Sequence, residues 1–369
     1  MKSYISAIGT ANPPYKLPQM RIADFMAEAV SMNAAEKKKL TALYRSTGIQ
    51  YRYTVLADYT RRNGAFDFYS NTPDLEPFPT IDRRMQLYKQ HAVPLCTEAI
   101  RNCLLAYPDF SPTQITHLIT VSCTGMYAPG IDIELVETIG LATNIQRTAI
   151  NFMGCYAAFN ALKTADAICK SNPEAKVLVV CVELCTIHFQ KYKTEDHLLS
   201  NAIFADGAAA VIMEASPRNE YSISIESLYC DLHFDGKNDM AWHIGNFGFE
   251  MTLSSYIPDL IKNGIRQLTE RLLKHLKLTT HDIHLFAIHP GGKRILEVIE
   301  QQLGLCKEDN RYAYQTLKAY GNMSSPTILF VLKALWNDLQ QSDAGKNILS
   351  FAFGPGLTLE SMLLKVHYR

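Results

Sequence analysis

The chain has 369 residues, of which 47% are hydrophobic and 20% are charged, and its 36 basic residues balance its 36 acidic ones. This length can bury a large hydrophobic core, in two domains or in one large double unit. Because the formal net charge is zero, the composition argues against nucleic acid as a partner, and any anionic ligand needs a local basic patch.

The nine cysteines are scattered along the chain and form no Cys-x-x-Cys pair. This pattern is typical of a reducing compartment rather than of a disulfide framework, and it does not indicate a metal site. The first residues read as a short strand and a proline-rich loop without the apolar core of a signal peptide, and no apolar run is long enough to span a membrane. We therefore expect a cytoplasmic protein without a membrane span.

In chain order, the first clear strand pattern is SPTQITHLITVSC at 111–123, and Gly154 then permits a turn before a helical pattern at 156–170. Small and apolar residues recur in that segment at helical spacing. Cys155 therefore lies at the predicted helix N-terminus, where the helix dipole and free backbone amides lower the pKa of a thiol. A buried structural cysteine is the ordinary alternative, so a reactive role requires catalytic partners nearby.

The second part of the chain repeats the first. His117 and His284 stand in register, 167 residues apart, within the similar segments SPTQITHLITVSC and LTTHDIHLFAIHP. A second pair, KVLVVCVEL and KNILSFAFG, is related by an offset of 170 residues. Two matches at nearly the same offset indicate a duplication, and apolar strands alternating with helices predict mixed or parallel sheets covered by helices. We therefore predict an α/β protein with halves at 1–215 and 216–369.

Two further residues come near Cys155 if the halves stack about a pseudo-twofold axis. The helix start in AYGNMSSPTILFVLKAL then faces the helix start after NFMG, which brings Asn322 close to Cys155. The strand that ends in LFAIHPGGK delivers His289 to the same end of the sheet, where loops beyond strand ends commonly form the ligand crevice. The sequence thus makes a constellation of Cys, His and Asn plausible.

Four motifs closely resemble the signatures of type III polyketide synthases, the chalcone-synthase-like enzymes of the thiolase superfamily: NFMGCYAAFNAL, AIHPGGKRIL, YGNMSSPTILFVL and FAFGPGLTLES. The resemblance runs along essentially the whole chain in the family's order and points to members that make alkylresorcinols or alkylpyrones. It implies a thiolase fold, in which two duplicated halves form a five-layered αβαβα core, and a homodimer. It implies neither a cofactor nor a metal, because the CoA thioesters are substrates.

The resemblance assigns the catalytic roles to Cys155, His289 and Asn322. Cys155 attacks an acyl-CoA as a thiolate, which an imidazolium at His289 would stabilise. His289 and the Asn322 amide then donate hydrogen bonds to the thioester carbonyl of malonyl-CoA, so that loss of carbon dioxide gives a stabilised enolate. That carbanion attacks the acyl group on Cys155 in a Claisen condensation.

The resemblance also implies contacts to the two substrates. Phe189 is matched to the first aromatic residue of a gate between the CoA tunnel and the cavity, and Met251 replaces the second. Other positions match the cavity wall: Thr124, Trp242, Ser324 and Phe353. A set of basic residues is expected to contact the CoA phosphates: Arg45, Arg52, Lys293 and Arg294. Ala352 stands where the family usually has a glycine, which puts the local backbone in doubt.

The starter and the product follow from Met251, Trp242 and Ala128, which stands where plant members of the family have a methionine that crosses into the partner's cavity. The flexible Met251 and the small Ala128 predict a tunnel for a medium or long fatty acyl-CoA starter. The rigid indole of Trp242 narrows the space around the growing chain and favours a folded conformer. We therefore expect cyclisation to alkylresorcinol or alkylpyrone products.

Three alternatives stay open at this point. One is an enzyme similar to tetrahydroxynaphthalene synthase, which uses malonyl-CoA only. Another is an initiating ketoacyl-ACP synthase, although that family typically follows its histidine with Gln-Ala-Asn where this chain has HPGGKRIL. The third is a non-catalytic scaffold of the thiolase fold that binds acyl-CoA.

Overall fold

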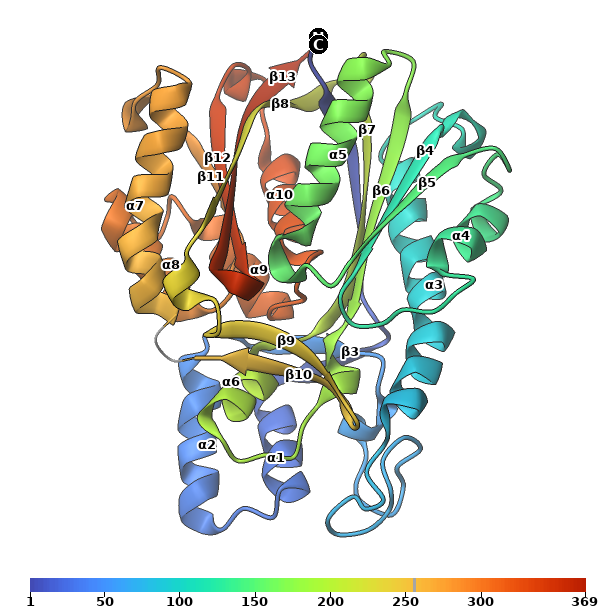
Figure 1. Ribbon diagram of the computed structural model, residues 1–369, viewed down its shortest axis with the longest axis vertical. Coiled ribbons are helices and arrows are strands. Elements are labelled where there is room, and N and C mark those ends of the chain that lie inside the picture. Colours follow the sequence, from blue (N-terminus) through green and yellow to red (C-terminus); the bar gives the residue numbers. More distant parts are fainter. Residues whose placement is uncertain (255–256) are drawn as a thin grey trace.

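The computed structural model describes residues 1–254 and 257–369 (Figure 1). A nine-stranded mixed sheet runs through the molecule. Its strands follow one another in space in the order β11 (Leu285–Ile288), β12 (Asn347–Gly354), β13 (Thr358–Tyr368), β8 (Tyr221–Leu232), β1 (Tyr4–Ala11), β7 (Asp206–Glu214), β6 (Lys176–Leu184), β4 (His117–Ser122) and β5 (Gln146–Asn151).

The sheet consists of two halves with the same strand order and the same strand directions. In the first half β1 pairs with β7 and β7 with β6 in antiparallel fashion, and β6 pairs with β4 in parallel fashion. In the second half the pairs of β8 with β13, β13 with β12 and β12 with β11 repeat these directions. The halves meet where Tyr4 and Ile5 pair with Ser224 and Ile223. This confirms the duplicated α/β architecture that the internal repeats indicate.

The helices form three layers around the two halves of the sheet. Alternate residues of β6 face opposite ways: Val177 and Val179 pack into a central core with α5 (Ala157–Ser171) and α10 (Thr327–Asp338). Leu178 and Val180 pack into an outer core with α3 (Ile81–Leu105). On the far side, α7 (Ile257–His275) and α8 (Lys293–Leu303) cover the second half. Figure 1 shows this αβαβα succession, with α5 and α10 in the middle.

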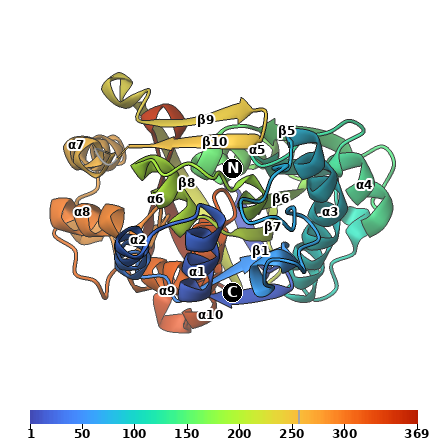
Figure 2. The same ribbon diagram turned by 90° about the horizontal axis from the view of Figure 1, so that it is seen from below.

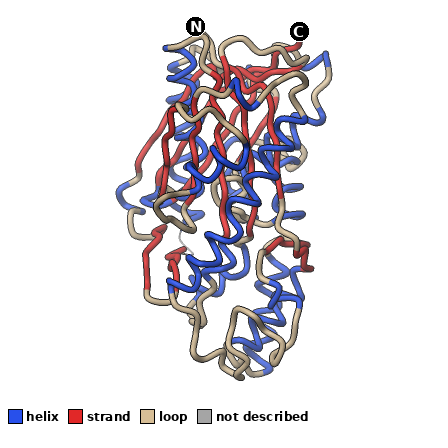
Figure 3. Tube along the Cα trace, turned by 90° about the vertical axis from the view of Figure 1, so that its right-hand side faces the viewer, coloured by secondary structure: helices blue, strands red, loops and turns tan. Residues whose placement is uncertain are grey.

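The remaining elements lie outside the nine-stranded sheet and the helices named above. Most of them gather at the lower end of the molecule in Figure 1, which Figure 2 shows from below. They are β2 (Tyr15–Pro18), α1 (Gln19–Ala29), α2 (Ala34–Ser46), β3 (Tyr51–Thr54), α6 (Glu195–Ile203), the hairpin of β9 (Met240–Gly245) and β10 (Gly248–Leu253), and α9 (Arg311–Tyr320). Helix α4 (Ile131–Ile139) instead packs beside α3 on the outer face. Both chain termini lie at the opposite end (Figure 3).

Two predictions concern the chain as a whole: the boundary between its halves and the lack of a membrane span. The proposed boundary between residues 215 and 216 falls in the loop that joins β7 to β8, and it stays a prediction. Within the described parts of the chain, no helix is long and apolar enough to cross a membrane.

Candidate active site

A cavity of about 250 Å³ lies between the strand ends of the second half and the elements gathered at the lower end of the molecule. We call it the outer cavity. Cys155, His289 and Asn322 all line it, together with Phe353 from β12 and Met251 from β10. The structure therefore brings together the three residues to which the sequence assigns the chemistry, although they come from three separate segments.

Cys155 owes its position to a tight turn. It lies in the short 3-10 turn Gly154–Tyr156, which runs directly into α5. Gly154 has a φ of +80°, and a Cβ atom there would lie 2.2 Å from Pro355 Cδ, so only glycine fits between this turn and the loop after β12. Ala352 lies earlier in β12, where it pairs regularly with Glu360, so its backbone does not require a glycine.

His289 follows β11 and is 1% exposed. Its backbone N–H donates to the carbonyl of Phe351 at 2.8 Å, which fixes the backbone beside the end of β12. Neither ring nitrogen of His289 has a hydrogen-bond partner. Buried polar atoms are normally paired, so an unpartnered imidazole that lines a cavity is available to a ligand.

Asn322 is held from both sides. Its backbone N–H donates to Ile203 O at 2.9 Å, and its carbonyl accepts from Ala205 N at 2.9 Å. The side-chain Oδ1 accepts from Ser324 N at 2.8 Å, while Nδ2 donates to Gly291 O at 3.2 Å. Because Oδ1 is occupied by the backbone, the amide group of Asn322 presents its nitrogen, a donor, to the cavity.

Burial sets the resting charges of Cys155 and His289. It raises the pKa of Cys155 to about 11, although hydrogen bonding from Ser324 and Asn322 acts to lower that pKa. Burial also lowers the pKa of His289 to about 3. The expected lowering of the thiol pKa by the helix terminus is therefore wrong, because desolvation outweighs it, and His289 alone is not an imidazolium. The thiolate and the imidazolium can form only together, by transfer of the thiol proton to the ring.

This coupling predicts the behaviour of a His289→Gln variant. Without its proton acceptor, Cys155 keeps the raised pKa, so its reaction with iodoacetamide should accelerate about tenfold for each pH unit between pH 7 and 10. The wild-type thiol should react faster at pH 7 and show a flatter profile. The measurement is the rate of carbamidomethylation of Cys155 by mass spectrometry. Identical profiles for the two proteins would show that His289 does not accept the thiol proton.

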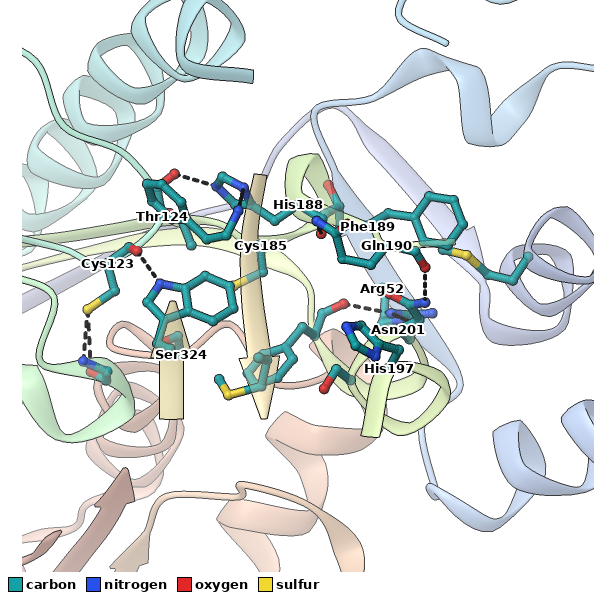
Figure 4. A pocket seen from close by; sticks show the side chains of 18 of the residues that line it. Arg52, Cys123, Thr124, Cys185, His188, Phe189, Gln190, His197, Asn201 and Ser324 are labelled. Carbon is teal, nitrogen blue, oxygen red and sulfur yellow. Dashed lines mark hydrogen bonds between the residues drawn. The ribbon is translucent and has the colours of Figure 1, made fainter. Parts of the chain in front are cut away.

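A second, smaller cavity of about 60 Å³ lies beside the outer one. We call it the inner cavity. Three of the predicted cavity-wall residues line it: Thr124, Trp242 and Ser324. Phe204, Met251 and Pro355 line both cavities, so they form the wall between them. Figure 4 shows the inner cavity from close by.

The structure corrects the position of the gate. Phe189 is buried against the rings of Phe25, Tyr69 and Phe78, and it lines the inner cavity but not the outer one. The aromatic residue beside Met251 in the dividing wall is Phe204, which follows α6. The sequence carries a signal that was missed, since Phe204 stands two residues before the buried strand β7, and it forms a backbone bridge to Asn322.

Trp242 and Met251 are neighbours in the inner cavity wall. They are direct cross-strand partners in the hairpin of β9 and β10. Trp242 Nε1 donates to the carbonyl of Cys123 at 2.7 Å, and the indole packs edge-on against Phe249. The indole is therefore fixed in place as part of the inner cavity wall.

Glu183, which the sequence analysis did not single out, holds two residues of the inner cavity wall, Thr124 and Cys123. It is completely buried near the end of β6. Its carboxyl accepts from Thr124 Oγ1 at 2.8 Å, from Ser325 Oγ at 2.7 Å and from Cys123 N at 2.9 Å. Burial raises the pKa of Glu183 to about 7. The available signal was an acidic residue inside the otherwise apolar run KVLVVCVEL, since buried acids require dedicated partners.

The four basic residues expected at the CoA phosphates separate into two groups. Lys293 and Arg294 begin α8 and line the outer cavity, and the Lys293 side chain lies over Gly48, close in sequence to the exposed Arg45. Arg52 does not belong to this group, because it is 2% exposed and lines the inner cavity instead. Its expected place at the tunnel mouth is wrong. Arg52 is held inside by the backbone carbonyls of Asn201 and Phe204, which are distant from it in sequence.

Comparisons with known proteins agree with this geometry. Family models of the chalcone and stilbene synthases match the N-terminal domain at residues 1–217 and the C-terminal domain at residues 229–367. The alpha-pyrone synthesis polyketide synthase-like Pks18 of Mycobacterium tuberculosis is 31% identical over 98% of this chain and 91% of its own length. Type III polyketide synthase A of Arabidopsis thaliana is 31% identical over 99% of this chain and 93% of its own length.

Two solved structures share the whole fold. The C-terminal type III polyketide synthase domain of Steely1 from Dictyostelium is 28% identical, with a TM-score of 0.90 over 99% of both chains. PKS-I from the brown alga Ectocarpus siliculosus is 30% identical, with a TM-score of 0.90 over 99% of this chain and 98% of its own. The chain therefore belongs to the chalcone and stilbene synthase family and is a type III polyketide synthase, an enzyme that transfers and condenses acyl groups.

Proposed function

We propose that the enzyme loads a starter acyl group on Cys155 and extends it with malonyl-CoA. The sulfur of Cys155 forms a bond to the acyl carbonyl carbon, the bond to the CoA sulfur breaks, and the thiol proton passes through His289 to the leaving CoA thiolate. The observation that supports this proposal most is the unpartnered, buried imidazole of His289 in the same cavity as Cys155.

Extension uses the donors of the outer cavity. A malonyl thioester carbonyl placed between His289 and Asn322 Nδ2 becomes an enolate oxygen as the carboxylate leaves as carbon dioxide. The enolate carbon attacks the thioester carbonyl on Cys155, and the Cys155 sulfur leaves as the thiolate. His289 can donate a hydrogen bond to the enolate only if it carries a proton on the ring nitrogen that faces the oxygen. Lys293, Arg294 and Arg45 would hold the CoA phosphates at the mouth of the outer cavity.

For the product we propose an α-pyrone. The relative Pks18 is named for alpha-pyrone synthesis. After each condensation the extended chain is a CoA thioester, and its transfer back to Cys155 releases CoA. A pyrone forms when an enol oxygen of that chain attacks the thioester carbonyl and releases the Cys155 thiolate, which takes up the enol proton, so ring closure requires no further active-site group. An alkylresorcinol, whose ring closes by carbon-carbon attack, is the alternative product.

The starter is better described as short than as a medium or long fatty acyl group. Ala128, expected to open a tunnel, is exposed on the surface and lines neither of the two cavities described above. The inner cavity has a volume of about 60 Å³. The fixed indole of Trp242 and the ring of Phe249 close it on one side. A chain of a few carbons therefore fits without rearrangement of the wall.

Trp242 is the residue whose removal should change the accepted starter. We expect Trp242→Gly to enlarge the inner cavity and to shift the preferred acyl-CoA toward longer chains by several carbons, because the indole fills space that an alkyl chain can occupy. Trp242→Phe is the control, since it keeps most of the volume and loses the hydrogen bond to Cys123 O. The measurement is product mass across acyl-CoA starters of increasing length. Equal preferences in wild type and Trp242→Gly would remove Trp242 from the starter site.

We also propose that the protein is a homodimer of the cytoplasm. Strand β5 is at the end of the sheet order, pairs with β4, and is largely exposed along its length, so one of its edges can pair with a second chain. All nine cysteines are free, as in proteins of reducing compartments. Light scattering after size-exclusion chromatography checks the dimer, and a monomer mass would contradict it.

The experiment for the proposed function is a product assay. Purified enzyme is incubated with malonyl-CoA and a panel of acyl-CoA starters, and the products are identified by mass spectrometry. We expect triketide or tetraketide α-pyrones from short starters. Products formed from malonyl-CoA alone would favour the tetrahydroxynaphthalene-synthase-like reading, and resorcinols from fatty acyl starters would overturn the proposed product and starter.

A further inference from the structure

One end of the inner cavity carries polar atoms that the proposed chemistry does not use. Arg52, His197 and Ser200 line this cavity, and each has a buried atom without a hydrogen-bond partner: Nη2 of Arg52, Nε2 of His197 and Oγ of Ser200. In Figure 4, Arg52, His197 and Asn201 lie together, away from Cys123 and Ser324. We call Arg52, His197 and Ser200 together the polar end. Buried polar atoms are rarely left unpaired, so three in one cavity point to a bound group.

The fold fixes this arrangement. His197 and Ser200 are three residues apart on α6, which places them on the same face of the helix. Arg52 comes from β3, and its Nε donates to Gln19 Oε1 at 2.8 Å. Its Nη1 donates to Asn201 O at 2.8 Å and to Phe204 O at 2.6 Å. These bonds hold the guanidinium rigidly and leave Nη2 unpartnered.

The polar end contains a buried positive charge, the guanidinium of Arg52, which favours binding of an anion. Arg52 is 2% exposed, and its guanidinium donates to the side-chain amide of Gln19 and to backbone carbonyls rather than to a carboxylate. Among the described residues that line the inner cavity, none is acidic. Asp206, whose charge acts on Arg52, already accepts from Thr186 and from the backbone of Val55. Burying a cation without a paired anion costs free energy that an incoming carboxylate would recover.

The other two residues can act as donors to the same group. The hydroxyl of Ser200 has a free hydrogen, since Oγ has no partner. Nδ1 of His197 lies 2.6 Å from Thr194 Oγ1. When the Thr194 hydroxyl donates to Nδ1, the proton of the neutral ring is on Nε2, which then donates into the cavity. One guanidinium nitrogen and two neutral donors form a set that suits the two oxygens of a carboxylate.

We propose that the polar end binds the terminal carboxylate of a short acyl chain carried on Cys155, so that the starter belongs to the dicarboxylic acyl-CoA class. This inference rests on the proposed function, because it assumes that Cys155 is the loading site. It agrees with the size of the inner cavity, which holds a chain of a few carbons. Cys155 lines the outer cavity and its neighbour Gly154 lines the inner one, so an acyl chain on Cys155 must extend past the dividing wall of Phe204 and Met251. Its carboxylate then lies in the inner cavity, away from the outer cavity where malonyl-CoA reacts.

The test compares two starters of similar shape. Succinyl-CoA ends in a carboxylate, and 4-methylpentanoyl-CoA ends in an isopropyl group of nearly the same size. The rate at which each acylates Cys155 is measured by intact-protein mass spectrometry without malonyl-CoA. We expect wild-type enzyme to load the succinyl group about tenfold faster, as one charge-assisted hydrogen bond provides.

Ser200→Ala and His197→Leu are the variants for this test. Arg52 is not replaced, because it also holds the carbonyls of Asn201 and Phe204, in the segment that pairs with Asn322, and its replacement can disturb the fold. Each variant should reduce the ratio of succinyl to 4-methylpentanoyl loading several-fold, and a change in the ratio distinguishes lost recognition from a general loss of folded enzyme. Equal loading of the two starters by wild type, or an unchanged ratio in both variants, would overturn the proposal. If Cys155 loads only neutral short starters, the dicarboxylic class is wrong while the proposed function stands. If no acyl-CoA acylates Cys155, the proposed function itself fails.

Discussion

Cys155→Ala should abolish acyl loading and lower product formation by on the order of 10⁴-fold or more, because the covalent intermediate can no longer form. Decarboxylation of malonyl-CoA to acetyl-CoA should continue in this variant. The reason is spatial: the backbone of His289 is held by Phe351, and Asn322 is held by Ile203, Ala205 and Gly291, so neither depends on the thiol for its position. The two measurements are the intact mass after incubation with acyl-CoA and the rate of acetyl-CoA formation from malonyl-CoA.

Cys306→Ala is the matched control for this experiment. Cys306 is an exposed free cysteine outside both cavities, so its removal should leave loading and product formation unchanged. A covalent acyl adduct that persists in Cys155→Ala and disappears in Cys306→Ala would contradict the assignment of the nucleophile.

Replacing Asn322 should produce the opposite defect. Asn322→Ala should retain acylation of Cys155 and lose malonyl-CoA decarboxylation by about 10²-fold to 10³-fold, the usual effect of removing one donor to a developing oxyanion. The alanine also removes the acceptor of the Ser324 N–H, so part of its effect can come from a disturbed loop.

Asn322→Asp separates these two effects. The aspartate keeps an oxygen that can accept from Ser324 N and loses the Nδ2 donor. We expect decarboxylation to fall as far as in Asn322→Ala, and the added negative charge also opposes enolate formation. Decarboxylation close to the wild-type rate in Asn322→Asp would show that the amide nitrogen is not an oxyanion donor.

The parts of the site that follow from chain order could be predicted from the sequence. Cys155 and Asn322 each precede a helix of the central layer, α5 or α10, and His289 follows a strand whose counterpart in the first half is β4. The repeat and the four motifs therefore placed all three at one end of the sheet. The five layers follow from the same repeat, since a strand such as β6 with apolar residues on both faces must be covered on both sides.

The parts that depend on distant contacts could not be predicted. Arg52 alternates with tyrosines in YRYT and reads as an exposed cation, but carbonyls of Asn201 and Phe204 about 150 positions later hold it inside. The choice between Phe189 and Phe204 as the gate depends on which ring lies between two cavities, and no local pattern contains that information. The prediction of a lowered pKa for the Cys155 thiol was wrong for a related reason, because the burial that raises this pKa depends on the assembled fold.

The most direct test of the account is a chase experiment on wild-type enzyme. The enzyme is first incubated with a short acyl-CoA, and peptide mapping by mass spectrometry locates the acyl group. Malonyl-CoA is then added, and the adduct and the released product are followed in time. The account predicts that the acyl group is on Cys155, that it disappears when malonyl-CoA arrives, and that a pyrone carrying the starter is released. An acyl group on another residue, or an adduct on Cys155 that malonyl-CoA does not consume, would contradict it.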